Sequence, residues 1–282
     1  MDAIPVETVV DVTTTIFVLS TMLAMGLELS LEQLLAPLKR RRLLAKSLLV
    51  NLLVVPMVAY LLVRAVTVEP GYAVGILLLA VAPGAPFGPK LAEISDSDIA
   101  FASGLMAILG IVSVATIPLS LAVFLPGEVA VDPVAIGQLV FVIQLVPLVA
   151  GLALVSRLPG VADRLFPPAQ RLSDATFVFL LALLSIVYLE DMIALVGTGT
   201  LFVASVVVAV SLLCGYVLGG PTRTTREVLA TTTAARNAAI ALFIATTSFT
   251  DPNVLTVVLA FSFIGVVASV LLAAVWRRRT LC

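Results

Sequence analysis

Apolar runs of roughly twenty residues alternate with short polar, glycine- or proline-containing turns along nearly the whole chain. A helix needs about 20 apolar residues to cross the hydrocarbon core of a bilayer. The pattern therefore predicts nine membrane-spanning helices, at 9–28, 42–64, 71–89, 98–125, 133–156, 172–194, 198–219, 226–248 and 252–276. The expected fold class is an all-α integral membrane protein.

Composition supports this prediction and removes other functional classes. Hydrophobic residues make up 61% of the chain and charged residues 12%, with a mean hydropathy of +1.20, whereas soluble domains carry about 25% charged residues. With no histidine and two cysteines, neither a metal site nor a cofactor is expected. The sequence contains no phosphate-binding glycine motif, basic nucleic-acid-binding patch or recurring catalytic pair. We therefore expect a non-enzymatic protein surrounded by the lipid bilayer, without a nucleic-acid partner.

The distribution of Lys and Arg predicts the orientation, because cytoplasmic loops carry an excess of these residues. With the N-terminus outside, 13 of the 16 basic residues fall in inward loops or in the tail at 277–282. The outward loops hold one, Arg64, beside several acids. No basic region precedes the first apolar run, which favours a retained helix over a cleaved signal. The prediction is a multi-pass protein of the cell membrane with a cytoplasmic C-terminus.

The third apolar run ends in a segment that disfavours helix, VAPGAPFGPKLAE at 81–93. Its prolines leave backbone carbonyls around 79–85 without intrahelical donors, which a membrane tolerates only where the backbone is buried in protein or lines a wet cavity. The candidate site residues here are Pro83, Gly84, Pro86, Gly88, Pro89 and Lys90. One interpretation is a helix break on a substrate pathway. The alternative is a re-entrant turn, or the end of a span with Lys90 reaching the cytoplasmic surface.

A second polar segment, TTTAARN at 231–237, interrupts the eighth run. A charge near mid-membrane costs several kcal/mol, so Arg236 must be compensated. The candidate site residues here are Thr231, Thr232, Thr233, Arg236 and Asn237. Arg236 would form an anion site or a fixed positive charge in place of a bound cation. The alternative is a structural ion pair with Glu93, Asp96 or Asp98.

The two interruptions occupy matching places in the chain. The spans divide into 9–125 and 133–276, and one further span before residue 9 would make two five-span halves with the broken span fourth in each. An odd number of spans orients the halves oppositely. Matching interruptions in both halves predict an inverted-repeat transporter.

Three segments resemble motifs of the bile acid:sodium symporter family: MLAMGLELS (22–30), APGAPFGPKLAEISDSDIAFASGLMAI (82–108) and TTTAARNAAIALFIA (231–245). Their order and their places among the spans agree with that family. The resemblance implies a panel domain at 9–28 plus 133–194 and a core domain at 42–125 plus 198–276. It also implies that the two broken helices cross near the membrane centre.

This sequence departs from the family at the sodium ligands. By resemblance, the Ser-Asn pair after the first break maps to Gly88 and Pro89, and the hydroxyl residues of the next helix map to Ala102 and Met106. The sodium-binding Glu and Gln of the second break map to Thr232 and Arg236, and only the Asn remains, as Asn237.

The departures lead to a prediction about coupling. Lys90 and Arg236 are expected to replace the charges of two sodium ions, so that a small or amphipathic organic anion is transported without sodium. Proton coupling through Lys90 is a related possibility. Ala82 stands where arsenite carriers of this superfamily have a cysteine, which disfavours metalloid efflux. The alternative function is a non-transporting membrane sensor or structural subunit that has kept the fold.

Overall fold

The computed structural model describes residues 5–125 and 132–280, which form helices joined by short turns with no β-strand among them. The first half comprises α1 (Val6–Glu28), α2 (Leu31–Lys39), α3 (Arg41–Leu49), the π-helical turn η1 (Val50–Val54), α4 (Val55–Val66), α5 (Pro70–Ala80), α6 (Gly88–Ile94) and α7 (Ile99–Phe124). The second half comprises α8 (Pro133–Val140), the π-helical turn η2 (Phe141–Leu145), α9 (Val146–Arg157), α10 (Pro159–Val187), α11 (Leu189–Ala194), α12 (Thr200–Leu218), α13 (Arg223–Ala235), α14 (Ala238–Ser248) and α15 (Pro252–Thr280).

Seven helical stretches of the described residues are long and apolar enough to cross a membrane. They correspond to seven of the nine predicted spans. The span predicted at 71–89 is divided between α5, a shorter apolar helix, and α6. The span predicted at 172–194 lies in α10 and α11, and α10 is not one of the seven. The prediction of a multi-pass helical membrane protein is confirmed, while the count of nine and the orientation remain predictions.

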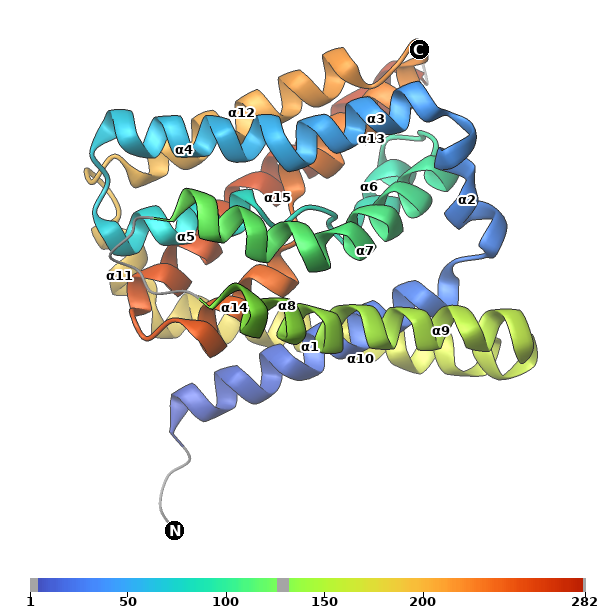
Figure 1. Ribbon diagram of the computed structural model, residues 1–282, viewed down its shortest axis with the longest axis horizontal. Helices are drawn as coiled ribbons and strands as arrows, with labels where there is room; N and C mark the ends of the chain where they lie inside the picture. The colour runs from blue at the N-terminus through green and yellow to red at the C-terminus, as the bar shows by residue number, and fades with distance from the viewer. Residues whose placement is uncertain (1–4, 126–131, 281–282) are drawn as a thin grey trace.

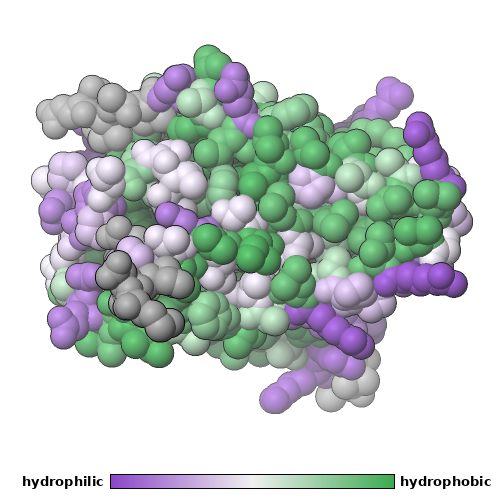
Figure 2. Space-filling model, turned by 90° about the horizontal axis from the view of Figure 1, so that it is seen from below, coloured by the Kyte–Doolittle hydropathy of each residue, from purple (hydrophilic) through white to green (hydrophobic). Residues whose placement is uncertain are grey.

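The outer surface is suited to lipid. Large apolar side chains such as Leu119, Val123 and Ile186 are exposed on the long helices. Figure 2 shows hydrophobic residues across the middle of one face, with hydrophilic residues gathered toward its two ends. A surface apolar in its middle and polar at its ends matches the profile of a bilayer.

Helix α1 packs along α9 and α10, and these helices lie side by side along one side of the molecule (Figure 1). The α1–α9 crossing is close because Gly26 and Gly151 face each other, with a Cβ at Gly151 falling 2.7 Å from backbone atoms of Gly26 and Leu27. Small residues at such crossings let membrane helices approach to backbone contact. Helix α2, which begins with a capping box between Ser30 and Gln33, leads from α1 to the remaining helices.

Two long helices contain a π-helical turn just before a proline. In η1 the N–H of Val55 bonds the carbonyl of Val50, immediately before Pro56. In η2 the N–H of Val146 bonds the carbonyl of Phe141, immediately before Pro147. Such turns often mark functional sites, and here each carries one fully buried polar side chain toward the helix breaks.

Candidate functional site

The first helix break lies between α5 and α6. Prolines at 83, 86 and 89 remove the donors that the carbonyls of Leu79, Ala82 and Ala85 would have in a continuous helix. Each of these carbonyls accepts a hydrogen bond from another backbone N–H. Ala82 N–H bonds the Leu79 carbonyl at 3.1 Å, Gly88 N–H bonds the Ala85 carbonyl at 2.9 Å, and Asn237 N–H bonds the Ala82 carbonyl at 2.9 Å. The predicted loss of intrahelical partners around 79–85 is confirmed.

The second break lies between α13 and α14 and is only two residues long. Arg236 has φ 50° and ψ 173°, a conformation that costs a non-glycine residue free energy and occurs where the surroundings hold it in place. Asn237 follows, and its side-chain oxygen caps α14 by accepting from the N–H of Ile240 at 3.2 Å. Since Asn237 also bonds Ala82, the two breaks meet, as Figure 1 shows near the middle of the molecule.

Arg236 is 1% exposed and is held by the π-helical turn η1. Its two terminal nitrogens donate to Asn51, to the side-chain oxygen at 3.0 Å and to the carbonyl at 3.2 Å. The Asn51 amide in turn donates to the hydroxyl of Thr233 at 3.1 Å. Arg236 Nε has no hydrogen-bond partner among the described residues. Within the same part of the chain, Arg236 makes no ion pair with Glu93, Asp96 or Asp98, so the structural pairing considered from the sequence is not found.

The Asn237 side chain is held by the other π-helical turn. Its amide donates to the side-chain oxygen of Gln144 at 3.2 Å. The Gln144 amide donates to the carbonyl of Gly110 and to the hydroxyl of Ser113, each at 2.6 Å. This chain of bonds connects the second break to η2 and α7, and every member has a partner.

Three of the positions that the resemblance maps to sodium ligands present apolar groups to one another. Gly88, Met106 and Thr232 come together there, and a Cβ at Gly88 would lie 2.7 Å from Met106 Cγ and 3.0 Å from Thr232 Cγ2. The hydroxyl of Thr232 donates to the Val228 carbonyl at 2.6 Å, which turns its methyl group toward Gly88. Thr231 likewise donates to carbonyls of its own helix. Among the described residues, no group of three or more acidic or thiol side chains could hold a metal.

Lys90 does not join Arg236 at the crossing. It lies on α6, pairs with Glu93 at 2.7 Å, and 66% of its side chain is exposed. The expectation of two cations at one site is therefore not met. The physical reason is that a separate short helix, α6, begins at Gly88, and Lys90 lies on its exposed face.

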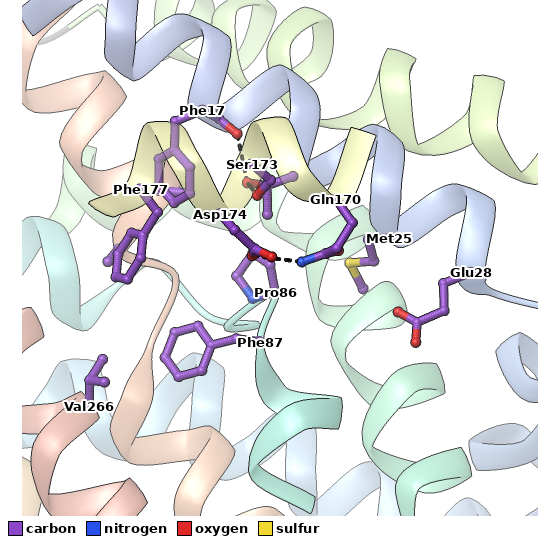
Figure 3. A pocket seen from close by; sticks show the side chains of 13 residues that line it. Phe17, Met25, Glu28, Pro86, Phe87, Gln170, Ser173, Asp174, Phe177 and Val266 are labelled. Atoms are coloured by element: carbon purple, nitrogen blue, oxygen red, sulfur yellow. Dashed lines mark hydrogen bonds between the residues drawn. The ribbon is translucent and has the colours of Figure 1, made fainter. Parts of the chain in front are cut away.

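A cavity of about 270 Å³ lies where α1 and α10 face the two breaks. Phe17, Thr21, Met25 and Glu28 of α1, Pro86 and Phe87 of the first break, Gln170, Ser173, Asp174 and Phe177 of α10, Ala238 and Ala239 of α14, and Val266 of α15 line it. Figure 3 shows Asp174 and Gln170 extending from α10 on the side of the Pro86–Phe87 turn. Thr21 and Ser173 join α1 to α10 through a hydrogen bond of 2.6 Å. A mainly apolar cavity with a few polar groups is typical of a small-molecule site.

A second cavity, of about 370 Å³, lies at the other end of α14. Val10 and Asp11 of α1, Tyr188, and residues 245, 246, 249–252 and 255 line it. Between the two cavities, α1 and α10 are closed against α14 by buried side chains that include Val18, Leu180 and Leu242. The two cavities thus occupy opposite ends of one interface, with a sealed middle.

A model of the sodium bile acid symporter family matches residues 15–210, more than half of the chain. The chain belongs to the sodium bile acid symporter family. The family consists of transporters, in agreement with the expectation of a non-enzymatic membrane protein. No curated protein matches the chain.

Sequence reasoning missed several residues of this family member's candidate site. Asn51 and Gln144 each stand alone in an apolar run, four or fewer residues before a Val-Pro pair, and that repeated pattern was the available signal. Glu28 and Asp174 carry no comparable motif. They sit at or near the ends of apolar runs, where acids are ordinarily solvated, and only the folded chain brings them to one cavity.

Proposed function

We propose that this member of the family is a secondary transporter that moves a small or amphipathic organic molecule without coupling to sodium. The observation that carries the proposal is the packing of Met106 and the Thr232 methyl group against Gly88. Sodium is a hard cation that needs several oxygen ligands. A thioether and a methyl group supply none.

Arg236 supports the same proposal. The guanidinium buried at the helix crossing places a positive charge there, and Asn51 holds it at two acceptors. We propose that this single charge takes the electrostatic part that a bound cation would play at the end of α13, where the helix dipole is negative. Lys90, exposed and paired with Glu93, has no such part.

The two cavities support a substrate path along one interface. Helices α1 and α10 form one side of this path, and α14 with the crossing of the broken helices forms the other side. We propose that α1 and the helices from α8 to α11 form the panel, and that relative movement of the remaining helices opens each cavity in turn. Rocking of one helix group against another around a fixed site is the usual mechanism of inverted-repeat transporters. The organic anion expected from the sequence rested on Lys90 and Arg236, and neither side chain lines the first cavity.

Counterflow in proteoliposomes tests the proposal. Vesicles loaded with an unlabelled probe would be assayed for uptake of the same labelled probe, using a bile acid, 4-tert-butylbenzoate and benzyltrimethylammonium, in sodium or potassium chloride of equal ionic strength. We expect at least one probe to exchange above protein-free vesicles, at rates within about twofold in the two salts, a difference of less than about 0.5 kcal/mol.

Roughly tenfold stimulation by sodium would contradict sodium independence. Absence of exchange for every probe, with correctly folded protein in the vesicles, would favour the alternative of a non-transporting sensor or structural subunit. That alternative draws on one observation, the replacement of all the mapped sodium side chains except Asn237.

A further inference from the structure

We infer that the junction of α2 and α3, residues 39–46, binds an anionic phospholipid of the surrounding membrane. The headgroup lies on the basic side chains of the junction, and an acyl chain lies along the outer face of α3 and α4. The inference does not depend on the proposed transport function. It is carried by unpaired positive charge at the head of a continuous apolar row that faces outward.

The outer face of α3 and α4 exposes a side chain at every fourth position. The row begins with Arg41 and continues across η1 with Ala45, Leu49, Leu53, Met57 and Leu61. Leu49 and Leu53 are 47% and 50% exposed. Half of a hydrocarbon core, about 15 Å, corresponds to about ten residues of helix. An acyl chain that enters beside Arg41 therefore covers Ala45 and Leu49 and ends near Leu53.

The junction carries more positive charge than its own side chains neutralise. Its five basic residues are Lys39, Arg40, Arg41, Arg42 and Lys46. Arg40 pairs with Asp98 at 2.8 Å. The other four are exposed and make no ion pair with the described residues. The one acid within residues 29–49 is Glu32, seven positions before Lys39. A negatively charged headgroup would supply the missing partner.

The unpaired charges of α3 lie beside the head of the apolar row. Arg42 and Lys46 are four residues apart, so they are neighbours on one face of the helix, next to Arg41. The first turn of α3 contains no acid and receives no side-chain cap, so the helix dipole adds to the positive potential. Arginine and lysine are the usual protein partners of phosphate. Four or more such residues next to a membrane helix are typical of anionic-lipid recognition.

Helix α2 holds the junction at the depth of the lipid headgroups. Figure 1 shows α2 at the end of the molecule where α3 begins, running across the direction of the long helices. One face of α2 packs on α7, where Gly104 makes room for Pro37, since a Cβ at Gly104 would lie 2.6 Å from Pro37 Cδ. The other face exposes Leu31, Leu35 and Leu38. A helix with an outward apolar face next to basic residues lies in the plane of the membrane interface.

Native mass spectrometry of the purified full-length protein tests the inference. Dioleoylphosphatidylglycerol and dioleoylphosphatidylcholine would be added together at equal concentrations, since they have the same chains and differ in headgroup charge. We expect the first bound lipid to be phosphatidylglycerol in about tenfold excess. Arg42→Gln combined with Lys46→Gln removes two of the unpaired charges and should lower this excess by about tenfold.

Arg157→Gln combined with Arg164→Gln is the matched control. It also removes two exposed basic side chains, at the turn from α9 to α10, where Asp163 adjoins Arg164. The control should change the excess by less than about twofold.

Three results would overturn the inference. One is equal binding of the two lipids by the unchanged protein, a comparison that needs no variant to fold. Another is an equal effect of the two double variants, which would mean that the charge of the whole protein attracts the lipid. The third is displacement of phosphatidylglycerol by glycerol 3-phosphate, which would mean that the phosphate binds without the acyl chain.

Discussion

The backbone amide of Asn237 donates a hydrogen bond to the carbonyl oxygen of Ala82 at 2.9 Å, and this bond joins the two broken helices. Ala82 accepts it because Pro86, four residues later, has no N–H to offer. The proline that breaks one helix therefore creates the acceptor that attaches it to the other. The Asn237 side chain meanwhile caps α14 and bonds Gln144, so one residue makes three connections.

Asn237→Ala is expected to lower the free energy of unfolding by about 1–3 kcal/mol, because it removes a helix cap and leaves the Gln144 oxygen without its donor. The midpoint of thermal unfolding in detergent measures the change. Asn253→Ala is the control, since the Asn253 side chain makes no hydrogen bond with the described residues. Equal midpoints for the two variants would contradict the account.

Arg236 and Asn51 are expected to be energetically coupled. Arg236→Lys should destabilise the protein, because one ammonium group cannot reproduce the two parallel bonds that the guanidinium makes to Asn51. In a double-mutant cycle with Asn51→Ala and Arg236→Ala, the coupling should be about 1–3 kcal/mol. Thermal or denaturant unfolding of the two single variants and the double variant gives this number. Simple additivity would mean that the pair is not a unit.

The apolar filling beside Gly88 predicts a rescue. Gly88→Ser adds atoms that collide with Met106, and overpacking of this kind costs about 1–3 kcal/mol. Met106→Ala combined with Gly88→Ser should recover part of that loss, because the thioether is removed. Unfolding midpoints would be compared in sodium and in potassium chloride. If the double variant were more stable in sodium chloride than in potassium chloride, the site would bind sodium once the overpacking is removed, and this result would contradict the account.

The close crossing of α1 and α9 depends on the absence of side chains at Gly26 and Gly151. Gly151→Leu should destabilise strongly, by about 3 kcal/mol or more, because its Cβ would already meet the backbone of Gly26 and Leu27, which cannot move aside as a flexible side chain can. Gly160→Ala is the matched control, as nothing lies within 4 Å of a Cβ there. Fluorescence-detected size-exclusion after heating measures both. Similar survival of the two variants would contradict the proposed backbone contact.

Much of this architecture could be predicted from the sequence, because membrane-spanning helices are recognised by the length and apolar composition of their segments. The first break is predicted by Pro83, Pro86 and Pro89, because proline has no backbone N–H in any conformation. Arg236 identified the second, because a charge within an apolar run has to be buried against something. Its partner could not be predicted. A carboxylate is the expected partner of a buried guanidinium, whereas Arg236 donates to the side-chain oxygen and the backbone carbonyl of Asn51 in a π-helical turn.

Lys90 illustrates a different limit. Its place next to a break suggested a buried charge, but a seven-residue helix has too few turns for its hydrophobic pattern to reveal which face is buried. The cavity shows the same limit at a larger scale. Phe17, Phe87 and Asp174 are far apart in the chain, and only the packing of α1 and α10 against the first break brings them together. Periodicity within one helix carries no information about such contacts.

Cavities at both ends of α14 have an electrical consequence. Ala239 lines one cavity and Ala245 the other, a separation of about 9 Å along the helix axis, against a hydrocarbon core of about 30 Å. Were water to fill both cavities, the bulk potential would extend inward from each side and most of the membrane voltage would fall across this short segment. A monovalent ion that crosses it would exchange energy with the field at about 2.3 kcal/mol per 100 mV. The membrane voltage would therefore act on a charged substrate over this short distance without any partner ion.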